Sequence, residues 1–264
     1  MRIGFIDSGV GGLSILAAVR AKVPAHYIYV MDNQYLPYGE KSEAFIQSRL
    51  AQLSALLVEQ GAELIVIACN TATTQAVASL RQQFDLPFVG TVPAIKPAAA
   101  KYCQSGFTVL ATPATCRSTY LQGLIAEFAP GCVVDTAGSS ELVRLAELKV
   151  WYQQDVSSAV ATELAKLGLM QQPPVAVVLG CTHFPFLKAE LSANLPGCVF
   201  LDTAEAIARR VQALVAGEDR LVDATEAYSQ LYISSGILDE RQLARITELG
   251  FDQYQHWPKP ATNI

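Results

Sequence analysis

Two cysteines follow apolar runs of the same kind, at positions 69 and 181, 112 residues apart. Cys69 comes after Leu-Ile-Val-Ile-Ala, and Cys181 comes after Ala-Val-Val-Leu-Gly. An apolar run of this length is typical of a strand that is buried on both faces of a parallel sheet. Because ligands bind beyond the carboxyl ends of such strands, we expect both thiols to face one site. Two equivalent thiols there suggest a reaction that needs a base and an acid on opposite sides of a substrate.

A histidine, His183, stands two residues after Cys181. Beside a thiol in a cleft, an imidazole can lower the thiol pKa or exchange protons with it. A second interpretation is a zinc site with Cys69, Cys181 and His183 as ligands, although zinc sites usually show ligand pairs that are closer together in sequence. A buried cysteine taken alone is more often a small apolar core residue. The match between the two segments favours a functional role for both cysteines over a packing role.

A glycine-rich turn, Asp7-Ser8-Gly9-Val10-Gly11-Gly12, follows the apolar run at residues 3–6. Its glycines permit unusual backbone angles, and the N–H groups at the start of the next helix favour an anion. The turn lacks the spacing of a dinucleotide-binding loop and the lysine of a P-loop. A turn without function is the alternative, but Asp7 at the end of a strand would lie beside the cleft.

Other polar groups also follow predicted strands. Asn70-Thr71 either caps the next helix or binds a carboxylate, and the hydroxyls of Thr112 and Thr115 carry the same two interpretations. Pro37-Tyr38-Gly39 reads as a turn. From their surroundings in sequence alone, Asp32 and Glu147 are interpreted as solvated or capping residues.

The composition is that of a globular chain, with 51% hydrophobic and 16% charged residues among 264. No apolar run approaches the ~20 residues that span a bilayer. An acidic residue at position 7 comes too early for a signal peptide, so we expect a cytosolic protein. The net charge of −5 without a basic cluster argues against nucleic acid as a partner, and an anionic substrate would need local donors.

Six cysteines are present, and the expected compartment is reducing, so we expect no disulfides. No C-x-x-C pair indicates zinc or redox chemistry. Cys103, Cys132 and Cys198 have no polar neighbours in sequence, and we interpret them as packing residues.

Strands and helices alternate along the chain, which predicts parallel sheets with right-handed crossovers. Expected strands are residues 3–6, 27–31, 64–68, 87–91, 107–111, 175–179, 200–201 and 232–235. Expected helices are residues 13–21, 42–60, 73–84, 115–128, 142–152, 157–167, 204–215 and 239–249. The repeated spacing of the cysteine strands and of residues 4–8 and 108–112 indicates two similar α/β halves with the site in the cleft between them.

Taken together, these motifs resemble the glutamate racemases, cofactor-independent members of the aspartate/glutamate racemase superfamily. The resemblance rests on Asp7 to Gly12, Pro37-Tyr38-Gly39, Cys69 to Ala72, Thr112 to Thr115, and Gly180 to His183, in order over nearly the whole chain. It implies two α/β domains related by pseudo-twofold symmetry, residues 1–93 plus 205–264 and residues 94–204. It also implies interconversion of L- and D-glutamate without a cofactor, which supplies D-glutamate for peptidoglycan in the bacterial cytoplasm.

Carried over residue by residue, the resemblance makes Cys69 and Cys181 the two proton donors and acceptors. Asp7 would assist Cys69, His183 would assist Cys181, and Glu147 matches a further acidic residue near His183. The implied substrate-binding residues are Asp7, Ser8, Tyr38, Gly39, Asn70, Thr71, Thr115, Thr182 and His183. The segment Met31-Asp32-Asn33-Gln34 departs from the usual Gly-Asp-Thr of the family. A homodimer and a cell-wall-precursor activator are further expectations, and activated relatives carry an N-terminal extension that this sequence lacks.

Two thiols suit racemisation because one base cannot easily reach both faces of a held substrate. An unperturbed thiol pKa of about 8.5 allows one to be thiolate and the other thiol near neutrality. The alternatives are a related superfamily enzyme, such as an aspartate racemase or a cysteine-dependent isomerase, and a non-catalytic amino-acid-binding protein with two lobes.

Overall fold

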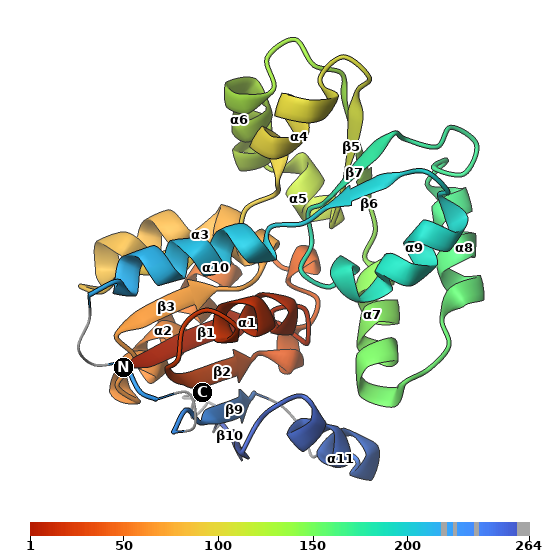
Figure 1. The fold of residues 1–264 in the computed structure, drawn as a ribbon. Helices are drawn as coiled ribbons and strands as arrows, with labels where there is room; N and C mark the ends of the chain where they lie inside the picture. Colours follow the sequence, from red (N-terminus) through yellow and green to blue (C-terminus); the bar gives the residue numbers. More distant parts are fainter. Residues whose placement is uncertain (218–220, 224–225, 235–237, 258–264) are drawn as a thin grey trace.

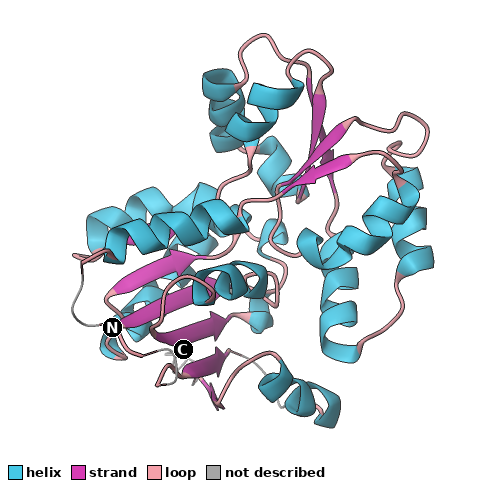
Figure 2. Ribbon diagram, viewed as in Figure 1, coloured by secondary structure: helices cyan, strands magenta, loops and turns pink. Residues whose placement is uncertain are grey.

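The computed structural model describes residues 1–217, 221–223, 226–234 and 238–257. These residues form two α/β domains, each built on a sheet whose strand pairs are all parallel (Figures 1 and 2). The predicted fold class is therefore confirmed. It follows from alternating strands and helices, because a parallel pair needs a crossover that covers one face of the sheet.

The first sheet has the strand order β10-β9-β2-β1-β3-β4. Its strands are β1 (Arg2–Asp7), β2 (His26–Met31), β3 (Leu64–Ile67), β4 (Phe88–Gly90), β9 (Ser229–Ile233) and β10 (Gln253–His256). The accompanying helices are α1 (Leu13–Arg20), η1 (Asn33–Tyr35), η2 (Tyr38–Glu40), α2 (Glu43–Glu59), α3 (Asn70–Gln83), α10 (Ala204–Val215) and α11 (Glu240–Glu248).

The second sheet has the order β6-β5-β7-β8. Its strands are β5 (Phe107–Ala111), β6 (Val134–Gly138), β7 (Ala176–Leu179) and β8 (Val199–Leu201). Its helices are α4 (Ile95–Tyr102), α5 (Pro113–Arg117), α6 (Thr119–Phe128), α7 (Glu141–Tyr152), α8 (Ser157–Lys166), η3 (Phe184–Leu187) and α9 (Lys188–Asn194).

The chain returns to the first domain after β8. Helix α10 packs on α1, and β9 pairs with β2, as Figure 1 shows. The strand expected at residues 232–235 begins earlier, at Ser229, and ends at Ile233; residue 235 lies outside the described residues. So do residues 218–220, 224–225, 236–237 and 258–264, which the expected first domain includes.

The register of the strands places each cysteine segment at the carboxyl edge of its sheet, beside the end of the neighbouring strand. Ile6 pairs with Ile67, so Asp7 and the residues before Cys69 leave the first sheet at the same edge. In the second sheet Leu110 pairs with Leu179, so the residues before Thr112 and Cys181 also leave together. Every residue of β3 and β7 is buried, which confirms the prediction of strands covered on both faces.

The single helix expected at residues 115–128 is two helices. Ser118 lies between them with extended backbone angles, φ −70° and ψ 139°. Its hydroxyl accepts a hydrogen bond from the Leu121 N–H at 3.1 Å, so it caps α6 as a new helix. Thr112 likewise caps α5 by accepting from the Thr115 N–H, which confirms the capping interpretation of that threonine.

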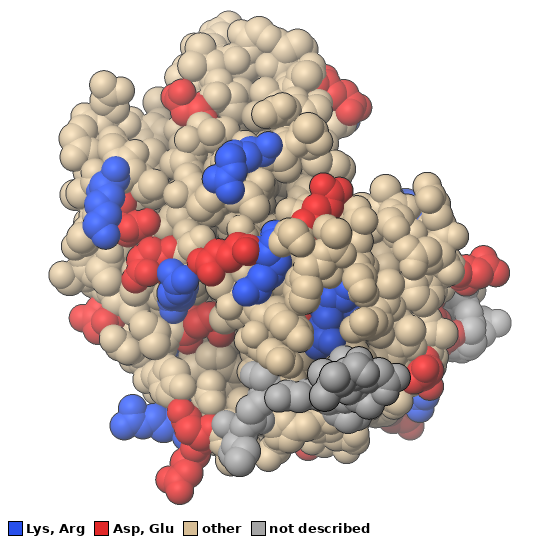
Figure 3. All heavy atoms as spheres, turned by 180° about the vertical axis from the view of Figure 1, so that it is seen from behind, with Lys and Arg blue, Asp and Glu red and all other residues tan. Residues whose placement is uncertain are grey.

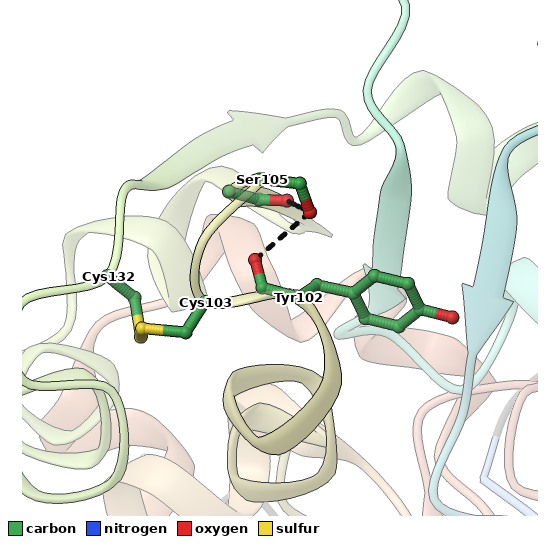
Figure 4. Close-up of a disulfide and its surroundings, with 5 residues drawn as sticks. Tyr102, Cys103, Ser105 and Cys132 are labelled. Atoms are coloured by element: carbon green, nitrogen blue, oxygen red, sulfur yellow. Dashed lines mark hydrogen bonds between the residues drawn. A yellow bond between two sulfur atoms is a disulfide. The ribbon is translucent and has the colours of Figure 1, made fainter.

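One cysteine prediction is wrong. Cys103, just after α4, and Cys132, before β6, form a disulfide with Cα atoms 4.6 Å apart (Figure 4). Neither is therefore a simple packing residue. Sequence spacing could not reveal the pair, because the two thiols meet only when α4 and β6 pack around β5. Cys69, Cys116, Cys181 and Cys198 are free.

Surface charge is mixed. On the face in Figure 3, Lys and Arg side chains are scattered among Asp and Glu rather than gathered in one basic area. Among the described residues, no helix has the length and apolar character to span a membrane.

Candidate active site

The thiols of Cys69 and Cys181 line one small cavity between the two sheets. Cys69 is 7% exposed and Cys181 6% exposed. The other lining residues are Ser8, Pro37, Tyr38, Gly39, Asn70, Thr71, Thr112, Val143 and His183. The cavity measures about 10 Å³, which suffices for about one water molecule. The strand ends therefore place a thiol from each domain at one enclosed point.

Cys69 sits at the N-cap position of α3. Burial, and then the nearby charge of Asp7, raise the pKa of the Cys69 thiol well above its ordinary value. Hydrogen bonds from the Ala72 and Thr71 N–H groups act in the opposite direction but are outweighed. The environment therefore favours the thiol form of Cys69.

Asp7 is fully buried next to Cys69 and is held by donors from both domains. One carboxylate oxygen accepts the Gly9 N–H at 2.9 Å, and the other accepts the Thr182 hydroxyl at 3.0 Å. Burial raises the pKa of Asp7 to about 6, against the opposing effects of the His183 charge and these hydrogen bonds. A carboxyl with such a pKa can exchange a proton near neutral pH.

Cys181 belongs to a chain of three side chains. Its Sγ lies 3.8 Å from Nδ1 of His183, and Nε2 of His183 lies 2.7 Å from Oε1 of Glu147. Burial lowers the pKa of His183, but hydrogen bonds with Cys181 and Glu147 outweigh it and raise the pKa well above its ordinary value. The arrangement favours the charged imidazolium form of His183.

The interpretation of Glu147 as a solvated or capping residue is wrong. Its side chain is 12% exposed, and its Oε1 also accepts the Val10 N–H at 2.7 Å. The remaining oxygen, Oε2, accepts the indole N–H of Trp151 at 3.0 Å. One N–H group of the glycine-rich turn, that of Val10, therefore binds a carboxyl side chain of α7.

The glycines of the turn are explained by the approach of the second domain. A Cβ at Gly9 would lie 1.9 Å from Oε1 of Glu147, and one at Gly11 would lie 2.3 Å from Nδ1 of His183. Real Cβ atoms do not approach other atoms so closely, so any other residue at Gly9 or Gly11 would displace Glu147 or His183 from its present position.

Three buried hydroxyls form a closed triangle at the other side of the cavity. Thr71, Thr112 and Thr115 have Oγ1 atoms 3.0–3.1 Å apart. Beside them the amide nitrogen of Asn70 is buried and has no hydrogen-bond partner among the residues that the structure describes. A buried donor without a partner is unfavourable, and a carboxylate entering the cavity would satisfy it.

Asp32 is also not solvated. It is fully buried and takes a two-pronged ion pair from Arg49, with nitrogen–oxygen distances of 2.9 and 2.6 Å. The Tyr38 hydroxyl donates to the same carboxylate at 2.6 Å. Asp32 therefore fixes the tyrosine that forms one wall of the cavity.

The predicted site residues thus separate into two layers. Cys69, Cys181, Ser8, Tyr38, Gly39, Asn70, Thr71 and His183 line the cavity, whereas Asp7, Thr115, Glu147 and Thr182 lie behind it and contact the first group. Sequence reasoning did not assign Pro37, Thr112 or Val143 to the lining. The turn around Pro37 and the hydroxyl of Thr112 were visible signals, but nothing in the sequence distinguished Val143 from other apolar residues.

Two other features bear on alternative sites. Among the described residues, no three His, Cys, Asp or Glu side chains are grouped so as to hold a metal ion. A larger cavity of about 440 Å³ opens beside Arg20 and Asp252, away from both thiols, and brings together none of the predicted residues.

The fold and site define a class of two-domain α/β proteins in which a thiol from each domain faces a shared cavity. The family model for Asp/Glu/Hydantoin racemase matches residues 13–211. The chain therefore belongs to the Asp/Glu/Hydantoin racemase family.

Individual relatives are more specific. The chain is similar to the glutamate racemase of Photorhabdus laumondii, with 46% identity over 255 residues that cover 94% of this chain and 88% of the relative. It is 42% identical to glutamate racemase of Escherichia coli O157:H7, covering 93% and 87%. A crystal structure of Escherichia coli glutamate racemase with L-glutamate and the activator UDP-MurNAc-Ala has a TM-score of 0.87 and 40% identity, covering 97% of each chain. Glutamate racemase from Aquifex pyrophilus has a TM-score of 0.73 and 28% identity, covering 96% of each.

Proposed function

We propose that this protein is a glutamate racemase that interconverts L- and D-glutamate without a cofactor. The observation that carries the proposal is the pair of buried thiols, one from each domain, lining a single cavity. Each has its own proton-exchanging neighbour, Asp7 for Cys69 and His183 with Glu147 for Cys181. The relatives at 42–48% identity that are named glutamate racemase support glutamate as the substrate.

In the L-to-D direction, the Cys181 thiolate takes the Cα proton of L-glutamate, and the Cys69 thiol gives its proton to the opposite face. Burial keeps Cys69 as a thiol, which suits its role as the proton donor in this direction. The imidazolium of His183 lies beside the Cys181 sulfur. In the D-to-L direction the roles are reversed, and Asp7 takes the proton from Cys69.

The carboxylates of the substrate need donors, because their charge and the charge developing at Cα are buried. Asn70, Thr71 and Ser8 present side-chain and backbone donors to the cavity, and Tyr38 and Gly39 form the facing wall. Thr115 supports Thr71 through its hydroxyl. The Thr182 hydroxyl donates to the Asp7 carboxylate. We therefore propose that these two residues position the thiols as well as bind the substrate.

The proposal includes the biological setting that the family implies: D-glutamate for peptidoglycan, made in the cytoplasm. It also includes the domain division at residues 1–93 plus 205–264 and 94–204, and a homodimer. By analogy with the Escherichia coli structure that holds UDP-MurNAc-Ala, a cell-wall precursor is the proposed activator.

The test is circular dichroism of purified protein with each glutamate enantiomer, with and without UDP-MurNAc-Ala. Both enantiomers should converge on zero ellipticity, and aspartate should be used far more slowly, because a site built for one side-chain carboxylate leaves donors unpaired with a shorter analogue. Equal or better use of aspartate would overturn the assignment to glutamate. Activity should also survive chelation under reducing conditions; loss that zinc restores would revive a metal site.

Cysteine variants test the mechanism. Cys69→Ser and Cys181→Ser keep the shape but offer a far weaker base, so each should lose nearly all racemisation, by more than about 10²-fold. Cys198→Ser is the matched control, since this free cysteine does not line the cavity. Retention of racemisation in either active-site variant would refute the two-thiol mechanism.

A further inference from the structure

The carboxylate of Glu147 is held by three donors, of which His183 also contacts the Cys181 sulfur. Oε1 accepts from the Val10 N–H and pairs with His183, whereas among the described residues Oε2 accepts only the indole N–H of Trp151, at 3.0 Å. Trp151 lies four residues after Glu147 on α7, so the two side chains project from the same face of the helix. The indole therefore fixes the carboxylate oxygen that the histidine leaves free.

The ring of Trp151 is itself firmly placed. It is 5% exposed and packs in an apolar cluster whose other members come largely from the first domain, including Val10 and Leu238. Its neighbours on α7 are tied to the same side: Arg245 of α11 donates to the Val150 carbonyl at 3.1 Å. The indole N–H thus comes from a rigid point where α7 meets the first domain.

We propose that Trp151 is a positioning residue for the half-reaction at Cys181. By holding Glu147, it aims Nε2 of His183 and so keeps Nδ1 facing the Cys181 sulfur. This inference rests on the proposed function. A hydrogen bond to a charged acceptor is stronger than one between neutral groups, and groups that orient a reactive side chain through a second contact have measurable effects on its chemistry.

Racemisation alone cannot test the proposal, because the equilibrium constant between enantiomers is one and both directions must slow together. The test uses L- and D-3-chloroglutamate. Loss of the Cα proton expels chloride and forms an enamine, which water converts to 2-oxoglutarate and ammonium. Each enantiomer then reports one deprotonation, the L-form by Cys181 and the D-form by Cys69.

Trp151→Phe removes the N–H and keeps an aromatic ring. We expect 2-oxoglutarate formation from the L-form to fall about tenfold or more, with the D-form changed less than threefold. The matched control is Tyr27→Phe, which loses a buried hydroxyl bond to the Val23 carbonyl in the same apolar cluster. It should leave the L-to-D ratio unchanged. Equal losses for both enantiomers, or no loss, would overturn the positioning role.

A second readout does not depend on turnover. Nuclear magnetic resonance titration of the three histidines, with His183 identified by its absence in His183→Asn, should show a lower His183 pKa in Trp151→Phe, because a displaced Glu147 no longer supports the imidazolium. An unchanged His183 pKa would contradict the inference. Failure of the wild-type protein to convert glutamate or either analogue would instead overturn the proposed function, and the two failures are therefore distinguishable.

Discussion

The two acids behind the thiols are anchored across the domain boundary. Asp7, beside Cys69, accepts the hydroxyl of Thr182, which follows Cys181. Glu147, on the side of Cys181, accepts the N–H of Val10, three residues after Asp7. Each half of the site is thus completed by the other domain. The two acids are therefore held in place by hydrogen bonds that form only when the domains are together, which links the geometry of the site to closure.

Asp7 should make the protein less stable as the pH rises. Its pKa is raised from 3.8 to about 6 on folding, so the folded state binds this proton more tightly than the unfolded state. The resulting stability is fully present below pH 3.8 and is lost as the pH rises through about 6. The shift corresponds to about 3 kcal/mol in the free energy of unfolding.

Asp7→Asn cannot titrate and isolates this effect. Relative to the wild type, its free energy of unfolding should rise by about 2.4 kcal/mol between pH 4 and pH 7, measured by urea denaturation across that range. Asp85→Asn, at an exposed position, is the control and should show little change with pH. A pH-independent difference between Asp7→Asn and the wild type would show that the folded-state pKa of Asp7 is not raised.

Arg49 should be essential for stability although it does not line the cavity. It is 5% exposed and supplies both ion-pair contacts to Asp32, so Arg49→Met would leave a buried carboxylate without its cation. Removal of one partner of a buried pair costs about 3–5 kcal/mol. Arg144→Met breaks an exposed pair with Glu40 and should cost less than about 1 kcal/mol. Chemical denaturation compares the two, and equal losses would contradict the structural importance of the buried pair.

At the scale of elements, the turn between β1 and α1 serves as the contact surface for the second domain. Gly9→Ala would place a methyl group on Glu147, so we expect at least a 10²-fold loss of kcat/KM for glutamate, with the first domain still folded. Gly123→Ala is the matched control: Gly123 lies within α6 with nothing within 4 Å of the added carbon. It should raise the free energy of unfolding by about 0.5–1 kcal/mol. Full activity in Gly9→Ala would mean that the domains need not approach this closely.

The elements that could be predicted from the sequence are those whose burial shows as a local run of apolar residues. Runs such as the one before Cys69 predicted β3 and β7, and with them the position of both thiols. The missed elements have weak patterns: β6 is a partly exposed edge strand, β10 is exposed throughout, and α4 contains Pro97. The intrinsic preferences of the residues in these three elements indicate little, because their structure is decided by tertiary contacts.

The site residues divide in the same way, into those with a local sequence signal and those without one. Cys69, Cys181, Asp7 and His183 stand at strand ends and were found from that position. Asp32 was misread because its partner Arg49 is 17 residues away, and only the packing of α2 against the sheet brings the charges together. The disulfide was missed for the same reason, since it depends on how α4 and β6 pack.

For the whole molecule, the size of the cavity implies motion. About 10 Å³ is far smaller than a glutamate molecule, so the substrate can enter only if the lining separates. The contacts that would break are those across the domain boundary, including the Ser14 hydroxyl on the Thr182 carbonyl at 3.1 Å and the Val10 N–H on Glu147. Opening therefore removes the hydrogen bonds that hold Glu147 and Thr182 from the first domain, and closing around the substrate restores them.

The disulfide connects the stability of the second domain to the redox state of the compartment. It closes a loop with a sequence separation of 29, which corresponds to about 3–4 kcal/mol of stabilisation through the unfolded state. Disulfides are uncommon in a reducing cytoplasm, where the protein is proposed to act. Neither Cys103 nor Cys132 lines the catalytic cavity, so we expect the folded domain to function with or without the bond.

Replacement of both residues, Cys103→Ser with Cys132→Ser, should lower the free energy of unfolding by about 3 kcal/mol and leave kcat/KM for glutamate within twofold of the wild type. The loss should match that caused by reducing the wild-type protein, with unfolding by urea followed by tryptophan fluorescence. Thiol titration of unfolded protein should give four free thiols before reduction, those of Cys69, Cys116, Cys181 and Cys198. Six free thiols in protein purified without reductant would show that the bond does not form, and a large fall in kcat/KM would show that it reaches the active site.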